Sequence, residues 1–131
     1  MYPKEIEKYV AELYRRRYEA IVVQRAEIRE GNWQPQLKKC HENVDAYCQL
    51  HKDFKPVRGW LFFDYGYFLD RVAFCQHSVV MSPDGRLIDI TPSNASQDYP
   101  FLSVEESDKD FFEKEKHTDD SGNLYYLFIG E

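Results

Sequence analysis

The sequence predicts an α+β domain in which amino-terminal helices pack on an antiparallel β-sheet. Apolar residues recur at helical spacing before residue 51, whereas alternating and β-branched runs dominate after residue 57. The length of 131 residues matches the usual size of one domain. We therefore expect a single domain over residues 1–131, helical over 4–51 and composed mainly of strands over 57–129.

The first stretch, from residue 4 to about residue 30, is predicted to be helical. Ile6, Val10 and Leu13 fall on one stripe at 3.6-residue spacing, and further apolar residues continue the pattern. Gly31 is a residue type typical of a helix end. Periodicity leaves open whether the stretch is one long helix or two.

A second helix is expected from Cys40 to about His51. Residues at offsets of three, four and seven share its apolar face, namely Cys40, Val44, Tyr47, Cys48 and His51. Cys40 therefore lies at the amino-terminal tip of this helix.

The later segments are predicted to be strands, because they are rich in aromatic and β-branched residues. The strands are expected at 57–65, 72–81, 87–90 and 124–129. Residues 103–116 are highly charged and only weakly amphipathic, so they are expected to form a helix or an irregular segment.

The turn between the second and third predicted strands sets a register. Pro83-Asp84 suits a type I turn, and Gly85 suits the left-handed residue that follows it. Such a three-residue loop pairs Ser82 with Arg86.

This register places His77 and Asp89 on one face of the hairpin, together with Val79 and Thr91. The two are then diagonal neighbours with Cβ atoms about 7 Å apart, within reach of a hydrogen bond. A two-residue turn would shift the register by one and separate them. A carboxylate that accepts from one imidazole nitrogen fixes the tautomer and leaves the other nitrogen free to act as a base.

Cys40 is the candidate nucleophile for this base. The unpaired N–H groups and the dipole of a helix amino terminus favour a thiolate, and the same N–H groups can bind an oxyanion. Cys48 and Cys75 are expected to be core residues. His41 is expected to point away from Cys40 around the helix and to lie at the surface.

These residues resemble a known superfamily. A cysteine at a helix start, His-Ser-Val-Val at 77–80, a Pro-Asp-Gly turn and Ile-Asp-Ile-Thr-Pro at 88–92 are similar to the Cys…His…Asp core of papain-like and transglutaminase-like thiol enzymes. The resemblance covers roughly residues 33–92. It implies a papain-like or transglutaminase-like core with the catalytic triad Cys40, His77 and Asp89.

The resemblance also implies an activity, which is thiol-dependent acyl transfer by an amide hydrolase, peptidase or deamidase. Gln34 stands six residues before Cys40, the spacing of the oxyanion-hole glutamine of papain-like enzymes, and Gln36 is the alternative. Trp33 and Trp60 are candidate walls of the substrate cleft, with a core position as the other interpretation of Trp60. The chain departs from the superfamily in lacking a tryptophan directly after Cys40.

Composition excludes several kinds of partner. The net charge is −6 and the basic residues form no stripe, so nucleic acid is not an expected partner. No apolar run approaches the length of a membrane span, and the amino terminus has no signal-peptide pattern. Three cysteines, an odd number, suit a reducing compartment. The expectation is a cytoplasmic protein with a protein or peptide substrate and no cofactor; secretion, delivery as an effector and the oligomeric state are left open.

Two alternatives compete with the enzyme. Cys48, His51, Cys75 and His77 form two pairs whose residue types suit a structural zinc site. The domain could also be a non-catalytic protein-binding module on the same scaffold.

Overall fold

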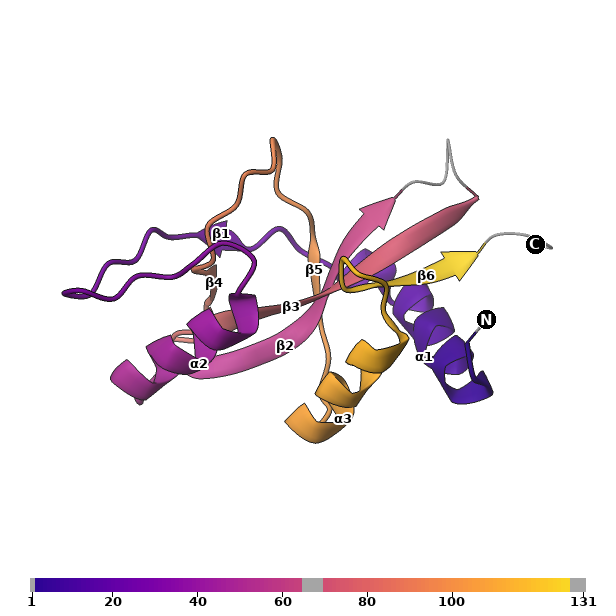
Figure 1. Cartoon of the computed structure of the whole chain (residues 1–131), viewed down its shortest axis with the longest axis horizontal. Coiled ribbons are helices and arrows are strands. Elements are labelled where there is room, and N and C mark those ends of the chain that lie inside the picture. The colour runs from indigo at the N-terminus through magenta and orange to yellow at the C-terminus, as the bar shows by residue number, and fades with distance from the viewer. Residues whose placement is uncertain (1, 65–69, 128–131) are drawn as a thin grey trace.

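The computed structural model describes residues 2–64 and 70–127 of the chain. Over these residues, three α-helices and a six-stranded mixed sheet form an α+β fold (Figure 1). The predicted α+β class is confirmed. The sheet is mixed rather than wholly antiparallel, because its short strand β1 (Gln24–Arg25) runs parallel to β4 (Leu87–Asp89).

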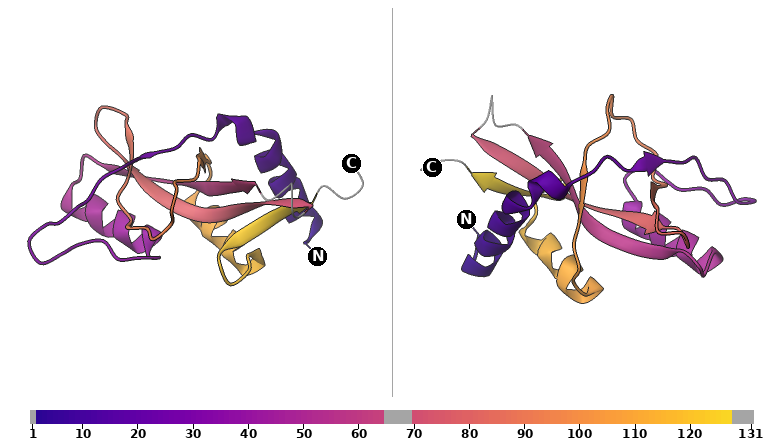
Figure 2. Two further views of the ribbon diagram at one scale, coloured as in Figure 1. Left: turned by 90° about the horizontal axis from the view of Figure 1, so that it is seen from above. Right: turned by 180° about the vertical axis from the view of Figure 1, so that it is seen from behind.

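Helix α1 (Lys4–Arg15) is shorter than the predicted helix at 4–30. A single 3₁₀ turn at Arg17–Glu19 follows it, and the chain then extends into β1. Figure 2 shows the chain leaving α1 and crossing the molecule through β1 to the loop that precedes α2. The prediction of helix over 4–51 is therefore wrong for most of residues 16–39.

The helix ends early because the sequence Ile21-Val22-Val23 favours extended backbone. Three consecutive β-branched residues lose side-chain freedom in a helix and fit a strand better. Ile21 forms a β-bridge with Phe101, and Val23 is buried in a small core cluster with Phe101 and Val79. Tertiary contacts with the sheet thus override the helical spacing that continues from α1.

The remaining strands form one sheet in the order β1-β4-β3-β2-β5, and β6 also pairs with β3. They are β2 (Lys55–Asp64), β3 (Arg71–Met81), β5 (Phe101–Ser103) and β6 (Asn123–Leu127). The strand predictions are confirmed within the described residues, while position 65 and positions 128–129 lie outside them. Strand β5 was not predicted.

Strand β3 has an open stretch along one edge. Its other edge pairs with β2 over ten residue pairs, from Lys55↔Met81 to Asp64↔Val72. The remaining edge pairs with β6 over Arg71–Cys75 and with β4 at Val80 and Met81. Between these two neighbours, the ladder is interrupted beside residues 76–79.

The hairpin between β3 and β4 has the predicted register. Ser82 donates its N–H to the carbonyl of Arg86 at 2.8 Å, and Gly85 has a left-handed φ of 86°. Val80 pairs with Ile88 in the ladder. The three-residue turn is confirmed, and with it the placement of His77 and Asp89 on one face.

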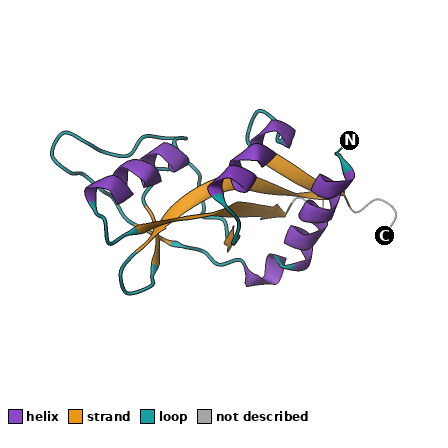
Figure 3. Cartoon of the chain, turned by 90° about the horizontal axis from the view of Figure 1, so that it is seen from below, coloured by secondary structure: helices purple, strands orange, loops and turns teal. Residues whose placement is uncertain are grey.

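Helices α1, α2 (Cys40–Leu50) and α3 (Asp108–Glu113) lie on one face of the sheet (Figure 3). The limits of α2 confirm the predicted second helix. The largest core cluster lies beneath α1 and α3, and a second one lies beneath α2, where Val44 and Tyr47 pack on Val80 and Ile90. The opposite face, which carries His77, is covered by residues around β1 and β5.

Candidate active site

Cys40 is the first residue of α2, and the chain turns sharply just before it. Lys38 has a left-handed φ of 62°, which is uncommon for a residue with a side chain. The first turn of the helix closes through a 2.8 Å hydrogen bond from the Asn43 N–H to the Lys39 carbonyl. The N–H groups that precede it have no partner within the helix, so they give the Cys40 end of α2 its positive potential.

His77 and Asp89 form the predicted pair. Nε2 of His77 lies 2.8 Å from Oδ2 of Asp89, and the two residues are only 8% and 5% exposed. The other carboxylate oxygen, Oδ1, accepts the backbone N–H of Thr91 at 3.1 Å. These bonds lower the pKa of Asp89 although its burial alone would raise it. The carboxylate is therefore charged, and Nδ1 of His77 is the ring nitrogen that does not contact Asp89.

Cys40 and His77 each shift the pKa of the other. Burial alone would raise the pKa of Cys40, but the influence of the nearby His41 and His77 side chains outweighs burial and lowers that pKa to about 6. Burial alone would lower the pKa of His77, but Asp89 and then Cys40 raise it to about 9. Between these values the pair is a thiolate and an imidazolium.

A cleft of about 660 Å³ gives access to this pair. Cys40 and His77 line it, with Leu37 and Lys38 before the helix, the 91–95 loop after β4 and the 118–122 turn before β6. Its size falls in the usual range for ligand sites.

Asn43 joins the two halves of the site. Its side-chain amide donates to the Gln36 carbonyl at 2.8 Å and to the Thr91 hydroxyl at 3.1 Å, and its Oδ1 accepts the Gln36 N–H at 3.0 Å. Thr91 belongs to the segment that binds Asp89, and Gln36 to the loop that leads to Cys40. A single buried side chain thereby fixes the loop before Cys40 against the segment that carries the histidine–aspartate pair. The signal in the sequence was a polar residue three positions after Cys40, near the buried stripe of α2.

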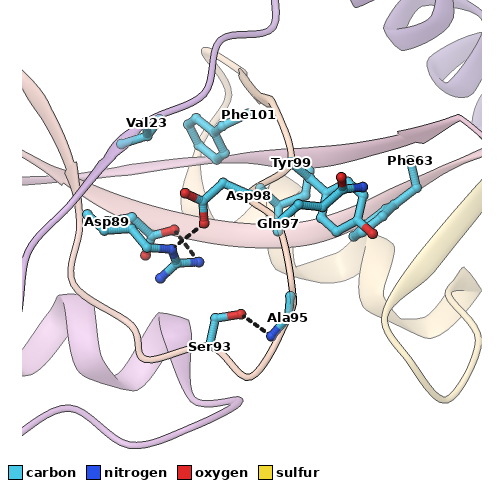
Figure 4. Close-up of a pocket in the computed structure, with 11 residues that line it drawn as sticks. Val23, Phe63, Asp89, Ser93, Ala95, Gln97, Asp98, Tyr99 and Phe101 are labelled. Carbon is cyan, nitrogen blue, oxygen red and sulfur yellow. Dashed lines mark hydrogen bonds and ion pairs between the residues drawn. The ribbon is translucent and has the colours of Figure 1, made fainter.

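Arg25 in β1 contacts Asp89 and the segment that follows it. Its Nη1 donates to the Thr91 carbonyl at 2.6 Å, its Nε contacts Asp98 at 2.6 Å, and its Nη2 lies 3.8 Å from Asp89. Arg25, Asp89 and Asp98 also line a separate small cavity with a volume of about 140 Å³. Figure 4 labels Asp89 and Asp98 at this cavity. Arg25 was not predicted as a site residue, because the predicted helix at 4–30 included the residues that form β1.

The space beneath His77 is shaped by Gly59, which pairs with it across β2 and β3. The Phe101 ring packs edge-on to the imidazole with centroids 6.0 Å apart. A Cβ on Gly59 would lie 2.2 Å from the Leu102 carbonyl oxygen and 2.7 Å from the Phe101 ring. Absence of a side chain at residue 59 therefore lets β5 approach and hold the ring against His77.

His41 is not the surface residue that helical geometry predicted. It is half-buried, its Nδ1 lies 2.6 Å from the Ser78 hydroxyl, and its ring packs edge-on to Phe111 and Phe112. The prediction failed because the tip of α2 meets the open edge of β3. There, consecutive residues of the helix contact consecutive residues of the strand, which face opposite sides of the sheet.

The other predicted site residues lie apart from the thiol. Gln34 and Gln36 are exposed, and the side chain of neither lines the cleft. Trp33 packs against Tyr47 of α2 instead of lining the cleft. Trp60 is fully buried beneath α1, where its indole donates to the Tyr9 hydroxyl at 2.9 Å. The prediction of Trp60 as a cleft wall is therefore wrong.

Cys48 and Cys75 do not share the environment of Cys40. Burial raises the pKa of both thiols, that of Cys75 to about 12. Cys75 lines the cleft rather than lying wholly in the core. Within residues 2–64 and 70–127, no three His, Cys, Asp or Glu side chains are arranged to hold a metal ion. The zinc alternative therefore has no support, since His51 instead contacts Glu30 and His77 contacts Asp89.

Comparison with protein families, curated proteins and solved structures finds no significant match to this chain. In the part of the chain that the structure describes, no helix is both long enough and apolar enough to cross a membrane.

Proposed function

We propose that this chain is a thiol-dependent acyl-transfer enzyme, an amide hydrolase, peptidase or deamidase on a papain-like or transglutaminase-like core. One observation carries the proposal. The thiol of Cys40, at the amino end of α2, lines the same cleft as His77, which lowers the pKa of the thiol and lies 2.8 Å from the buried carboxylate of Asp89. A bare structural pair on a hairpin would not require a low-pKa thiol beside it.

The residues take the roles that this chemistry needs. The Cys40 thiolate attacks the carbonyl carbon of an amide, and a carbon–sulfur bond forms while the carbonyl oxygen becomes an oxyanion. Backbone N–H groups at the start of α2 stabilise the oxyanion. His77 then donates its Nδ1 proton to the leaving nitrogen as the carbon–nitrogen bond breaks.

The second half of the reaction returns the free enzyme. His77, now neutral, accepts a proton from water as the water attacks the thioester, and the acid product leaves as the thiolate reforms. An amine in place of water would make the same site a transferase. Asp89 stays charged throughout and keeps Nε2 of His77 protonated.

The proposed substrate is a protein or peptide. The 660 Å³ cleft is lined by two loop segments, 91–95 and 118–122, and we expect such loops to bind an extended chain better than a small rigid ligand. The thiolate mechanism also requires that Cys40 stays reduced, which suits a reducing compartment.

A reaction with p-nitrophenyl acetate tests the proposal without knowledge of the natural substrate. We expect a burst of p-nitrophenolate and acetylation of Cys40, detected by peptide mass spectrometry. Cys40→Ser should abolish both, and Cys48→Ser, on the same helix, should leave both unchanged. An absent burst, or acetyl groups on other residues only, would favour a non-catalytic binding module instead.

A further inference from the structure

The small cavity beside Arg25 adjoins the cleft that Cys40 and His77 line. We propose that this cavity is a specificity pocket that takes one uncharged aromatic side chain of the substrate, one or two residues from the amide that Cys40 attacks. The inference rests on the proposed function and deepens it, because it names the side chain that the enzyme selects. Five apolar or aromatic residues line the pocket, namely Val23, Leu61, Phe63, Tyr99 and Phe101.

The strand register joins the pocket to the cleft. Leu61 of β2 pairs with Cys75 of β3 on one side and with Phe101 of β5 on the other. Paired residues point to the same face of a sheet with Cβ atoms about 4.5–5.5 Å apart, so the three side chains form a row across the strands. Cys75 lines the cleft, Phe101 lines the pocket, and Leu61 lines both. Leu61 is therefore a wall that the two cavities share, as are Arg25, Ser93 and Ala95.

The same register sets the distance from the proposed base to the pocket. His77 pairs with Gly59, two residues before Leu61, so His77 and Leu61 are diagonal neighbours. Diagonal neighbours in a sheet lie about 7–8 Å apart. An extended peptide advances about 3.3 Å per residue, so two residues of a substrate span this separation. A side chain one or two residues from the attacked amide therefore reaches the pocket.

The size and the lining of the pocket suit one aromatic ring. Its volume is about 140 Å³. An engineered apolar cavity of about 150 Å³ in another protein binds benzene. The lining includes the buried Val23 and Phe101, and the rings of Phe63 and Tyr99 pack with centroids 4.2 Å apart at an angle of 51°. A ring that enters the pocket can pack against these rings in the tilted arrangements that aromatic pairs prefer.

The charged groups at the pocket are already paired with one another. Nε of Arg25 contacts Asp98 at 2.6 Å, and Nη2 lies 3.8 Å from Asp89. Nη1 of the same guanidinium donates to the Thr91 carbonyl at 2.6 Å. A cationic guest would compete with Arg25 for the two carboxylates, and an anionic guest would be repelled by them. An uncharged side chain leaves all of these contacts in place.

The outer wall of the pocket belongs to the exposed loop at 93–98. The Ser93 hydroxyl accepts the N–H of Ala95 at 3.0 Å and bends this loop (Figure 4). Gln97 in the loop lines the pocket but does not line the cleft. A larger residue at position 97 should therefore fill the pocket without disturbing the core or the surroundings of Cys40.

Alkylation of Cys40 by peptide-like iodoacetamides tests the pocket in the whole chain. The reagents are iodoacetyl-X-methylamide and iodoacetyl-Gly-X-methylamide, with phenylalanine, leucine, lysine, glutamate or glycine at X. The thiolate displaces iodide as a carbon–sulfur bond forms, and peptide mass spectrometry assigns the label to Cys40. At one of the two positions, we expect phenylalanine to exceed glycine by about 10- to 100-fold in the second-order rate of labelling, since the ring becomes buried. Leucine should be intermediate, and lysine and glutamate should be close to glycine.

Two variants change the pocket in opposite directions. Gln97→Trp should fill the pocket with an indole and bring the ratio of the phenylalanine rate to the glycine rate close to one. Phe63→Ala should enlarge the pocket and move the preference to a reagent with naphthylalanine at X. Gln49→Trp makes the same change as Gln97→Trp at an exposed glutamine of α2, so it is the matched control and should keep the ratio.

Equal rates for phenylalanine and glycine at both positions would overturn the pocket, as would faster labelling by the lysine or glutamate reagent. A ratio unchanged in both Gln97→Trp and Phe63→Ala would overturn it too. These outcomes differ from failure of the proposed function. If Cys40 reacts with every reagent as slowly as an ordinary thiol but the ratio persists, the activated nucleophile fails and the pocket stands. If Cys40 reacts fast with no ratio, the pocket alone is refuted.

Discussion

Nε2 of His77 donates to Oδ2 of Asp89 across 2.8 Å, and this bond leaves Nδ1 as the ring nitrogen that is free to act as a base. The contact joins β3 to the end of β4 inside one hairpin, so a local turn sets it. Cys40 comes from a separate element, α2, which packs beside the edge of β3 that has no ladder partner between β4 and β6. The site therefore needs both a local and a long-range contact.

Removal of the Asp89 charge should impair His77 in its proposed role as a base. In Asp89→Asn the side-chain amide favours the wrong tautomer of His77, and we expect acyl transfer to fall by about 10²- to 10⁴-fold. Steady-state rates with p-nitrophenyl acetate measure the loss. Asp84→Asn, in the turn of the same hairpin, is the control and should retain activity; equal losses in both variants would point to general damage to the hairpin.

Asn43→Ala should loosen the site and weaken the fold. It removes three hydrogen bonds and leaves the buried Thr91 hydroxyl without this partner, so we expect a loss of about 1–3 kcal/mol in the free energy of unfolding. Urea denaturation measures it, and Gln49→Ala on the exposed face of α2 is the control. Cys40 should also react more slowly at pH 7. Stability equal to that of the control would show that Asn43 does not hold the loop.

Gly59→Ala should separate β5 from His77. The new Cβ would meet a backbone oxygen at 2.2 Å, which only a shift of the strand can relieve, at a cost of about 1–3 kcal/mol. Thermal unfolding measures the cost, and Lys55→Ala at the exposed start of the same strand serves as control. Unchanged stability and unchanged thiol reactivity would mean that the packing of Phe101 on His77 is dispensable.

Activity should follow a bell-shaped pH profile. The thiolate forms as the pH rises through about 6, and the imidazolium is lost as it rises through about 9. The logarithm of kcat/KM against pH should therefore have limbs near these values. A single rising limb that extends past pH 9 would contradict the thiolate–imidazolium pair.

The contribution of His77 and Cys40 to the free energy of unfolding should be nearly independent of pH between about 6.5 and 9. His77, with a raised pKa, stabilises the fold below its ordinary value of 6.5, and this contribution is lost as the pH rises through 9. Cys40, with a lowered pKa, stabilises the fold above its ordinary value of 9.0, and this contribution is lost as the pH falls through 6. One gain offsets the other, because folding moves a proton from sulfur to nitrogen without net uptake. Denaturation at several pH values in a Cys40→Ala variant, in which only the His77 contribution remains, should expose a decline with rising pH.

Local chemistry made the hairpin predictable. A Pro-Asp-Gly turn adopts few backbone conformations. Because side chains alternate along a strand, the turn alone then places His77 and Asp89 on one face, whatever the remaining fold. The start of α2 at Cys40 followed from the same kind of short-range pattern. These two predictions are confirmed by the register and by the helix limits.

Residues that depend on distant partners were missed. β1 is only two residues long and is stabilised by pairing with β4. The helical spacing of apolar residues therefore led to a predicted helix at 4–30 that included β1. Trp60 could not be placed by its strand alone, since its burial depends on α1 packing over that face. His41 depends on the open edge of β3, which no pattern in the sequence predicts.

The rate of Cys40 alkylation by iodoacetamide as a function of pH tests the central claim most directly. Peptide mass spectrometry assigns the label to Cys40 rather than to Cys48 or Cys75. We predict that the rate in the unmodified protein rises through a midpoint near pH 6 and that the midpoint moves above pH 8 in His77→Ala. A midpoint near the ordinary 9.0 in both proteins would contradict the account.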